Sequence, residues 1–178
     1  MKYIPLLLLT ILATTAFAAT FEETLKLADK GDVDAQYNLA LMYAIGEGVP
    51  ENDAVAVKWF RKAADQGYAN AQNNLGVMYD NGEGVPENDA VAVKWYRKAA
   101  DQGYADAQCN LGIMYAKGEG VPENSIRAYV WLSMAKTQGQ TNAAKNIDIL
   151  KTEMTPKQIA DGQALAAKCY KSNYKDCD

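Results

Sequence analysis

Apolar residues recur at helical spacing in paired segments along most of the chain. In the stretch 71–80 they lie at offsets of 0, 4, 7 and 8 residues and form one stripe: Ala71, Leu75, Met78 and Tyr79. Gly82 follows and predicts the end of this helix, because glycine tolerates the positive φ that a helix end requires. After the loop GEGVPEN, Asn88 can cap a second helix with its side-chain oxygen. The pattern therefore predicts two helices joined by a glycine-containing loop.

This helical pair repeats along the chain with a fixed period. The stretch 46–69 returns as 82–105, a shift of 36 residues, with a single change from Phe60 to Tyr96. Further positions recur at the same shift: Asn38, Asn74, Asn110 and Asn146, and Leu39, Leu75, Leu111 and Ile147. A period in this range is typical of a solenoid, in which each unit buries its apolar face against the next. A glutamate that recurs in each GEG loop, at positions 47, 83 and 119, is interpreted as a turn feature.

The register divides the chain into six segments. We expect a signal peptide at 1–18, an N-terminal capping helix at 19–33, repeats at 34–69, 70–105 and 106–141, and a degenerate half-repeat with a C-terminal capping helix at 142–178. The capping helix should begin at Thr155, because Thr155 and Gln158 flank a proline in a capping-box pattern. No strand pattern of comparable strength is present, so the predicted fold class is all-α.

The first eighteen residues resemble a secretory leader. Lys2 precedes an apolar run that Pro5 interrupts, and small residues stand at the first and third positions of the triplet 16–18. The continuous apolar part is shorter than the roughly 20 residues that a membrane-spanning helix needs. An uncleaved anchor is the alternative. We expect a mature protein that begins at Ala19, is not inserted in a membrane, and is periplasmic or secreted.

Charge and composition exclude several classes of function. The chain has 18 Lys and Arg, 22 Asp and Glu and no histidine. Without Lys2 the balance is 17 minus 22, or −5, which argues against a nucleic-acid partner or an anionic membrane surface. The lack of histidine excludes Ser–His and Cys–His catalysis and leaves no ordinary zinc site. We expect no catalytic residue, no metal and no cofactor, and the sequence specifies no oligomeric state.

The three cysteines follow the leader, so disulfides are permitted. Cys169 and Cys177 are close in sequence and form the expected pair. Cys109 is left over, and two interpretations of it stay open: a small buried apolar residue, or an accessible thiol.

The repeated residues resemble a known family, the Sel-one-like repeat (SLR) proteins, which are relatives of the tetratricopeptide repeats. The residues that carry the resemblance are Ala71, Leu75-Gly76, Tyr79, Gly82-x-Gly84-Val85, Ala92, Trp95-Tyr96, Lys98-Ala99-Ala100 and Gly103. The resemblance implies a right-handed α/α superhelix whose concave side is lined by the first helices. It also implies an adaptor that holds a protein or peptide. Bacterial secreted members are similar to envelope regulators or to immunity proteins that neutralise a toxin. A cysteine-rich branch resembles weak β-lactamases, but it carries a cysteine pair in every repeat and this chain does not.

The first helices also carry residues outside the packing stripe. By helical geometry these residues face away from it, and they form the predicted binding surface for a protein or peptide: Tyr37, Asn38, Leu41, Asn73, Asn74, Val77, Cys109, Asn110 and Ile113. Aliphatic residues rarely recur on a face that is open to solvent. The asparagines beside them could bond an extended peptide backbone. Alternatively, the asparagines bond neighbouring repeats or cap loops, or they are kept without a role because the repeats were copied recently. We predict a periplasmic or secreted adaptor or regulator that holds a protein or peptide on the concave face of the solenoid, with an immunity protein or a weak β-lactamase as alternatives.

Overall fold

The computed structural model describes residues 20–177, which form α-helices and no strand. The predicted signal peptide lies outside these residues. A helical segment at 20–29 precedes α2 (Val33–Ile45), α3 (Asp53–Asp65), α4 (Ala69–Asn81), α5 (Asp89–Ala100), α6 (Ala105–Lys117), α7 (Ser125–Thr137), α8 (Thr141–Glu153) and α9 (Pro156–Lys171). In the described part of the chain, no helix is long and apolar enough to cross a membrane.

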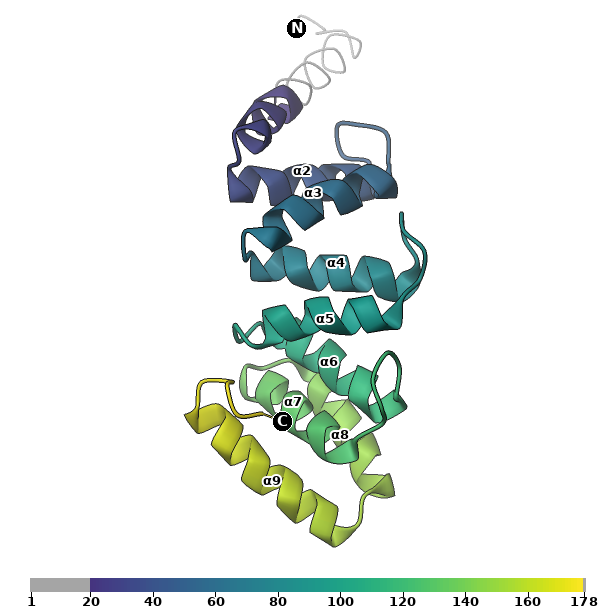
Figure 1. Ribbon diagram of the computed structural model, residues 1–178, viewed down its shortest axis with the longest axis vertical. Helices are drawn as coiled ribbons and strands as arrows, with labels where there is room; N and C mark the ends of the chain where they lie inside the picture. Colours follow the sequence, from purple (N-terminus) through teal and green to yellow (C-terminus); the bar gives the residue numbers. More distant parts are fainter. Residues whose placement is uncertain (1–19, 178) are drawn as a thin grey trace, which may run out of the picture.

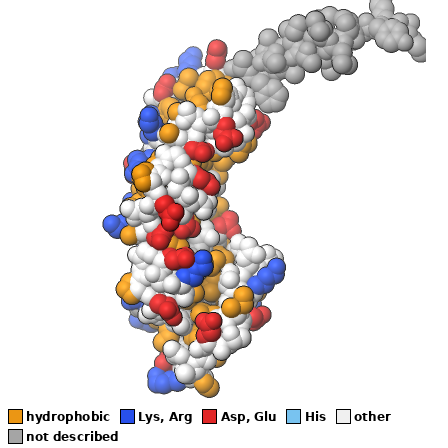
Figure 2. Space-filling view, turned by 90° about the vertical axis from the view of Figure 1, so that its right-hand side faces the viewer, with side chains coloured by type: hydrophobic (Ala, Val, Ile, Leu, Met, Phe, Trp, Pro, Cys, Tyr) orange, Lys and Arg blue, Asp and Glu red, His pale blue; other side chains and the backbone are white. Residues whose placement is uncertain are grey.

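The helices stack in antiparallel pairs along the long axis of the molecule (Figure 1). The pairs are α2 with α3, α4 with α5, and α6 with α7, and each second helix also packs against the first helix of the next pair. Seen from the side that carries the loops within the pairs, the stack is curved (Figure 2). The predicted all-α solenoid of helix-turn-helix units is confirmed.

The local signals that bound the helices act as the sequence indicates. Gly82 ends α4 at φ +73°, and its N–H bonds to the carbonyl oxygen of Met78. The Asn88 side chain accepts a hydrogen bond of 3.1 Å from the N–H of Val91 and caps α5. Asn52 and Asn124 cap α3 and α7 in the same way. Each cap satisfies a backbone donor that the first turn leaves unpaired.

The core is built from the predicted stripe and the face of the second helix that opposes it. Leu75 is fully buried, and Tyr96 of α5 lies across α4. A Cβ added to Gly76 would come within 2.7 Å of the Tyr96 ring, so glycine is required where the two helices meet. A Cβ at Gly112 would likewise meet Leu132, so glycine is also required where α6 meets α7.

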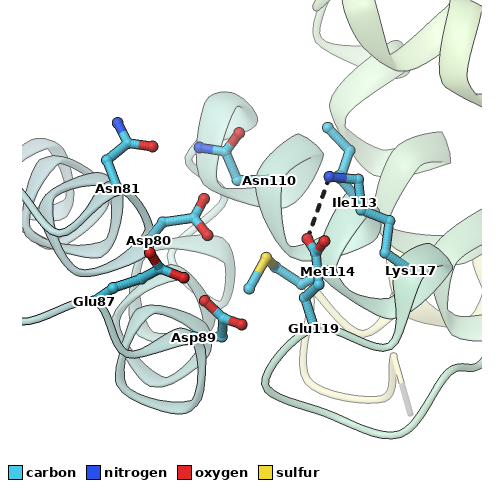
Figure 3. Close-up of a pocket in the computed structure, with 9 residues that line it drawn as sticks. All are labelled: Asp80, Asn81, Glu87, Asp89, Asn110, Ile113, Met114, Lys117 and Glu119. Atoms are coloured by element: carbon cyan, nitrogen blue, oxygen red, sulfur yellow. Dashed lines mark ion pairs between the residues drawn. The ribbon is translucent and has the colours of Figure 1, made fainter.

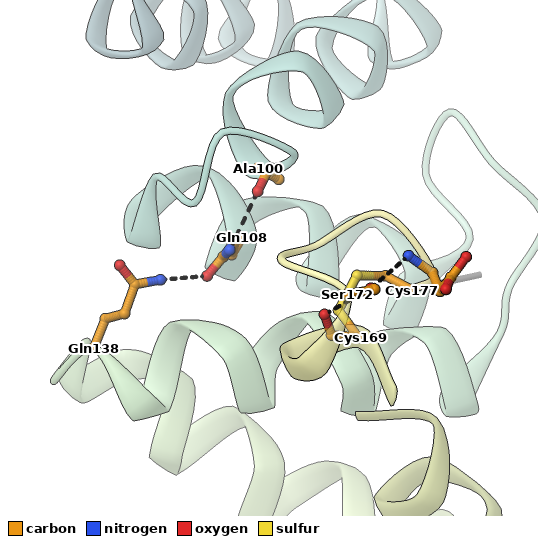
Figure 4. The surroundings of a disulfide bond; sticks show 7 residues. Ala100, Gln108, Gln138, Cys169, Ser172 and Cys177 are labelled. Atoms are coloured by element: carbon orange, nitrogen blue, oxygen red, sulfur yellow. Dashed lines mark hydrogen bonds between the residues drawn. A yellow bond between two sulfur atoms is a disulfide. The ribbon is translucent and has the colours of Figure 1, made fainter. Parts of the chain in front are cut away.

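Buried glutamines link successive units. Gln108 of α6 is fully buried, and its Nε2 donates to the backbone carbonyl of Ala100 at the end of α5 at 3.2 Å. Its Oε1 accepts from Gln138 at 2.7 Å (Figure 4). The pairs Gln36–Gln66 and Gln72–Gln102 repeat this arrangement in the units before. Because each buried amide is satisfied at both ends, the pattern fixes the register of the stack without an unpaired polar group.

The loops of one unit lie against the second helix of the unit before. A Cβ added to Gly120 would come within 2.4 Å of the Asp89 backbone, and one added to Gly84 would be as close to Asp53. Both glycines also have positive φ, of 67° and 68°. Gly84 and Gly120 are therefore each required twice, for the backbone conformation and for the close approach between units.

The C-terminal helix covers the end of the stack. Thr155 and Gln158 form the predicted capping box at the start of α9, which packs against α7. Cys169 and Cys177 form the expected disulfide, with Cα atoms 4.5 Å apart (Figure 4). Under this cover Trp131 of α7 is completely buried, whereas its counterparts Trp59 and Trp95 keep 9 % and 7 % of their surface.

Candidate functional site

Two pockets lie between successive units. The first inter-repeat pocket has a volume of about 250 Å³ and is lined by residues of units one and two: Leu41, Ala44, Asp53, Phe60, Asn74, Val77, Met78 and Glu83. The second inter-repeat pocket has a volume of about 340 Å³ and is lined by residues of units two and three: Asp80, Asn81, Glu87, Asp89, Asn110, Ile113, Met114, Lys117 and Glu119. Both pockets are bounded by a GEG loop and by the start of the preceding second helix.

The two pockets are copies of one site, displaced by one repeat. Position by position, Asn74, Val77 and Met78 of the first correspond to Asn110, Ile113 and Met114 of the second, and Asp53 and Glu83 correspond to Asp89 and Glu119. The stacking of equivalent units produces both, because the same loop meets the same helix start at each junction.

One chemical difference between the pockets arises at two paired positions. Ala44 and Phe60 in the first unit are replaced by Asp80 and Tyr96 in the second. The Tyr96 hydroxyl donates to Oδ2 of Asp80 at 3.1 Å. The single change within the copied stretch therefore has a structural reason: the added hydroxyl has a carboxylate to bond. One pocket is largely apolar and the other largely acidic.

The second pocket concentrates negative charge. The carboxyl groups of Asp80, Glu87 and Asp89 lie on one side and that of Glu119 lies across Met114 (Figure 3). Lys117 pairs with Glu119 at 3.2 Å. Partial burial raises the pKa of Asp80, and the charges of Asp89 and Glu119 raise it further, while the Tyr96 hydrogen bond and Lys117 oppose the rise. Burial, followed by the Asp80 charge, also raises the pKa of Tyr96, which keeps this phenol a donor.

The recurring asparagines join the units to one another. The Nδ2 group of Asn74 donates to the hydroxyl of Tyr37 at 3.5 Å, and that of Asn110 donates to Oδ1 of Asn73 at 3.1 Å. In the third occurrence of the same pattern, Asn146 lowers the pKa of the neighbouring Cys109 thiol. Asn74 and Asn110 thus contact the neighbouring repeat and also line the pockets, and their predicted role in binding stays a prediction.

Two of the nine predicted surface residues are not on an open face. Cys109 retains 2 % and Asn73 6 % of their surface, which corrects the expectation that both face away from the packing. The helical-wheel reasoning considered one buried stripe, but a first helix also lies beside the first helix of the next unit. Asn110 of α6 covers Asn73, and α8 packs against α6 where Cys109 lies. Burial raises the pKa of the Cys109 thiol, and Asp106 adds to the rise.

The other predicted residues divide into two groups. Half-buried Leu41, Val77 and Ile113 line the pockets together with Asn74 and Asn110. Tyr37 packs on Phe60 and Tyr68, with ring centroids 5.7 and 5.1 Å away, and Asn38 is exposed; neither is a pocket residue. Sequence reasoning missed the pocket carboxylates: Asp53, Asp80, Glu83, Glu87, Asp89 and Glu119. The joint change at positions 80 and 96 was the one signal that could have found them.

No group of three or more acidic residues or cysteines within residues 20–177 could hold a metal ion. The pockets are recesses lined by aliphatic and carboxylate side chains.

Comparison with known proteins identifies the repeat. The family model of the Sel1 repeat matches residues 33–68, 69–104 and 105–140. A Sel1 repeat protein from Oxalobacter formigenes is 38 % identical, with 71 % of this chain and 96 % of that chain covered and a TM-score of 0.66. No curated protein matches the chain.

Two further solved structures share the fold. A protective antigen with an SLR fold from uropathogenic Escherichia coli strains is 31 % identical, at a TM-score of 0.65, over 86 % of this chain and 41 % of that longer chain. Cysteine-rich protein B of Helicobacter pylori is 20 % identical, at a TM-score of 0.59, over 74 % of this chain and 95 % of its own. Because the three matched repeats cover more than half of its residues, the chain belongs to the Sel1 repeat family.

Proposed function

We propose that this protein is a periplasmic or secreted adaptor or regulator that holds a segment of another protein across the two inter-repeat pockets. Proteins with Sel1 repeats typically mediate protein–protein interactions, and the fold is in general a non-enzymatic scaffold. The disulfide between Cys169 and Cys177 supports a location in an oxidising compartment.

One observation carries the proposal. Leu41, Val77 and Ile113 recur at one position of successive units and remain half-exposed on pocket floors, where no side chain of the described residues covers them fully. Aliphatic side chains in such pockets lose unfavourable contact with water when a partner covers them. The pockets repeat with the units, so a partner that runs along the stack meets an aliphatic side chain at the same position of each pocket.

Affinity capture tests the proposal. The bait is residues 19–178, presented to a periplasmic extract beside a groove variant that carries Leu41→Asp, Val77→Asp and Ile113→Asp. A matched control carries Ile149→Asp and Tyr170→Asp, at exposed apolar positions of α8 and α9 outside both pockets. We expect a protein that the wild type and the control retain and that the groove variant loses. Equal retention by all three baits would place the partner elsewhere and contradict the proposal.

A further inference from the structure

The difference between the two pockets restricts the chemistry of the partner. An apolar pocket and an acidic pocket stand one repeat apart, so a ligand that fills both needs two different groups at a fixed spacing. We propose that the bound segment is an extended peptide that places an aliphatic side chain in the first inter-repeat pocket and a lysine or arginine side chain in the second. This inference rests on the proposed function and deepens it.

Pocket size favours single side chains over a small-molecule ligand. Sites for drug-sized ligands generally enclose about 300–1,000 Å³. The first pocket, at about 250 Å³, is smaller than that range, and the second, at about 340 Å³, is at its lower end. Two modest recesses in a row suit successive side chains of one extended chain.

The lining of the first pocket selects an aliphatic group. Leu41, Val77 and Met78 come from the first helices, and Ala44 and Phe60 complete the apolar part of the wall. Asp53 and Glu83 stand in the same pocket, so a peptide main chain with donors would meet acceptors beside the aliphatic floor.

Charge selects a cation for the second pocket. Of its four carboxylates, only that of Glu119 is paired with a lysine of the chain, at 3.2 Å. Asp80 accepts from a neutral phenol, and within residues 20–177 neither Glu87 nor Asp89 forms an ion pair. Asp89 lies in the first turn of α5. An arginine could bond two of these oxygens at once.

The charge distribution around the pockets also favours a cationic partner. Acidic side chains gather along the middle of the face that carries the GEG loops (Figure 2). The exposed lysines of the second helices, Lys58, Lys62, Lys94 and Lys98, lie outside both pockets, and Lys62 and Lys98 lie over the rings of Trp59 and Trp95. A cationic segment is therefore drawn to the loop face and repelled by the second-helix face.

The spacing of the pockets predicts the spacing of the two side chains. Packed helices lie about 8–10 Å apart, and an extended chain advances about 3.3 Å per residue. About three residues of an extended peptide therefore span the distance between successive first helices. The expected pattern is an aliphatic residue and a cationic residue separated by two others.

Peptide binding tests this inference. The probes are fluorescein-labelled peptides in which leucine and arginine are separated by two serines, in either order, with glycine and serine flanks. Matched probes carry glutamine instead of arginine. The test variant carries Asp80→Ala and Tyr96→Phe, which copies the residues that the chain already uses at positions 44 and 60. Asp148→Asn, at an exposed position of α8, controls for the loss of one negative charge.

We expect one order of the arginine peptide to bind the wild type about tenfold more tightly than its glutamine counterpart. The control should keep this preference, the test variant should lose it, and added salt should weaken it. Equal affinity for arginine and glutamine peptides, a preference that survives in the test variant, or no binding of any probe would overturn the inference. Displacement of the peptide by calcium chloride, beyond that caused by sodium chloride at equal ionic strength, would also overturn the inference.

The capture experiment separates this inference from the proposed function. A partner lost from the groove variant, together with no preference for the arginine peptide, would leave the proposed function standing and reject the aliphatic–cationic pattern. A partner retained by the groove variant would reject the proposed function itself.

Discussion

The first and second inter-repeat pockets share one backbone design and differ in chemistry. Both are walled by a GEG loop, a first helix and the start of the preceding second helix. Ala44 and Phe60 add apolar surface to the first pocket, whereas Asp80, which accepts a hydrogen bond from Tyr96, adds a carboxylate to the second. A repeat protein can thus keep the residues that stack its units and obtain a different recess at each junction from one coupled pair of positions.

The largest expected effect comes from the loop that walls the second pocket. Gly120→Ala should lower the free energy of unfolding by about 2 kcal/mol or more, because a positive φ is strained for alanine and the new methyl meets the Asp89 backbone. Gly139→Ala is the matched control, since Gly139 has a φ of +85° but nothing within 4 Å of its Cβ position. Urea denaturation measures both. An equal loss in the two variants would show that the close packing of the loop is unimportant.

A smaller effect is expected when the first pocket is given the residues of the second. Ala44→Asp adds a carboxylate beside Asp53 and Glu83, and Phe60→Tyr adds a hydroxyl that can bond it. A double-mutant cycle should give a favourable coupling energy of about 1 kcal/mol between the two changes. Strict additivity in urea denaturation would mean that the hydrogen bond between Tyr96 and Asp80 does not explain the paired change.

The smallest effect concerns pH. The pKa of Asp80 is raised in the folded protein, so its contribution to stability is fully present below the unfolded pKa and is lost as pH rises through the folded pKa. Asp80→Asn should therefore have a slightly higher Tm than the wild type at pH 7, and the gap should close as pH falls below about 3.9, the usual value for Asp. A lower Tm at pH 7 would show that the carboxylate stabilises the fold.

Most of the fold could be predicted from the sequence because its signals are local and repeated. Gly82 and Asn88 mark helix ends by backbone conformation and capping, which depend on adjacent residues alone. The disulfide partners Cys169 and Cys177 are eight residues apart. Each of these inferences needs no knowledge of how one unit sits against another.

The pockets could not be predicted in the same way because they arise between units. Glu119 in a GEG loop has the pattern of a turn residue, and Asp89 that of a residue in the first turn of a helix. Only stacking brings the loop of one unit to the helix start of another. The same limit explains Asn73 and Cys109, whose burial depends on the neighbouring first helices α6 and α8. A helical wheel describes one helix and contains no information about the next.

Hydrogen exchange of the complex with the captured partner tests most directly the claim that the partner lies across both inter-repeat pockets. We predict slower amide exchange on binding in the stretches 74–89 and 110–120, which contain most of the pocket walls. Amide exchange on the outer faces of α3 and α5 should not change on binding. Slower exchange confined to α3 and α5, or to α8 and α9, would contradict the claim and place the binding surface on another side of the solenoid.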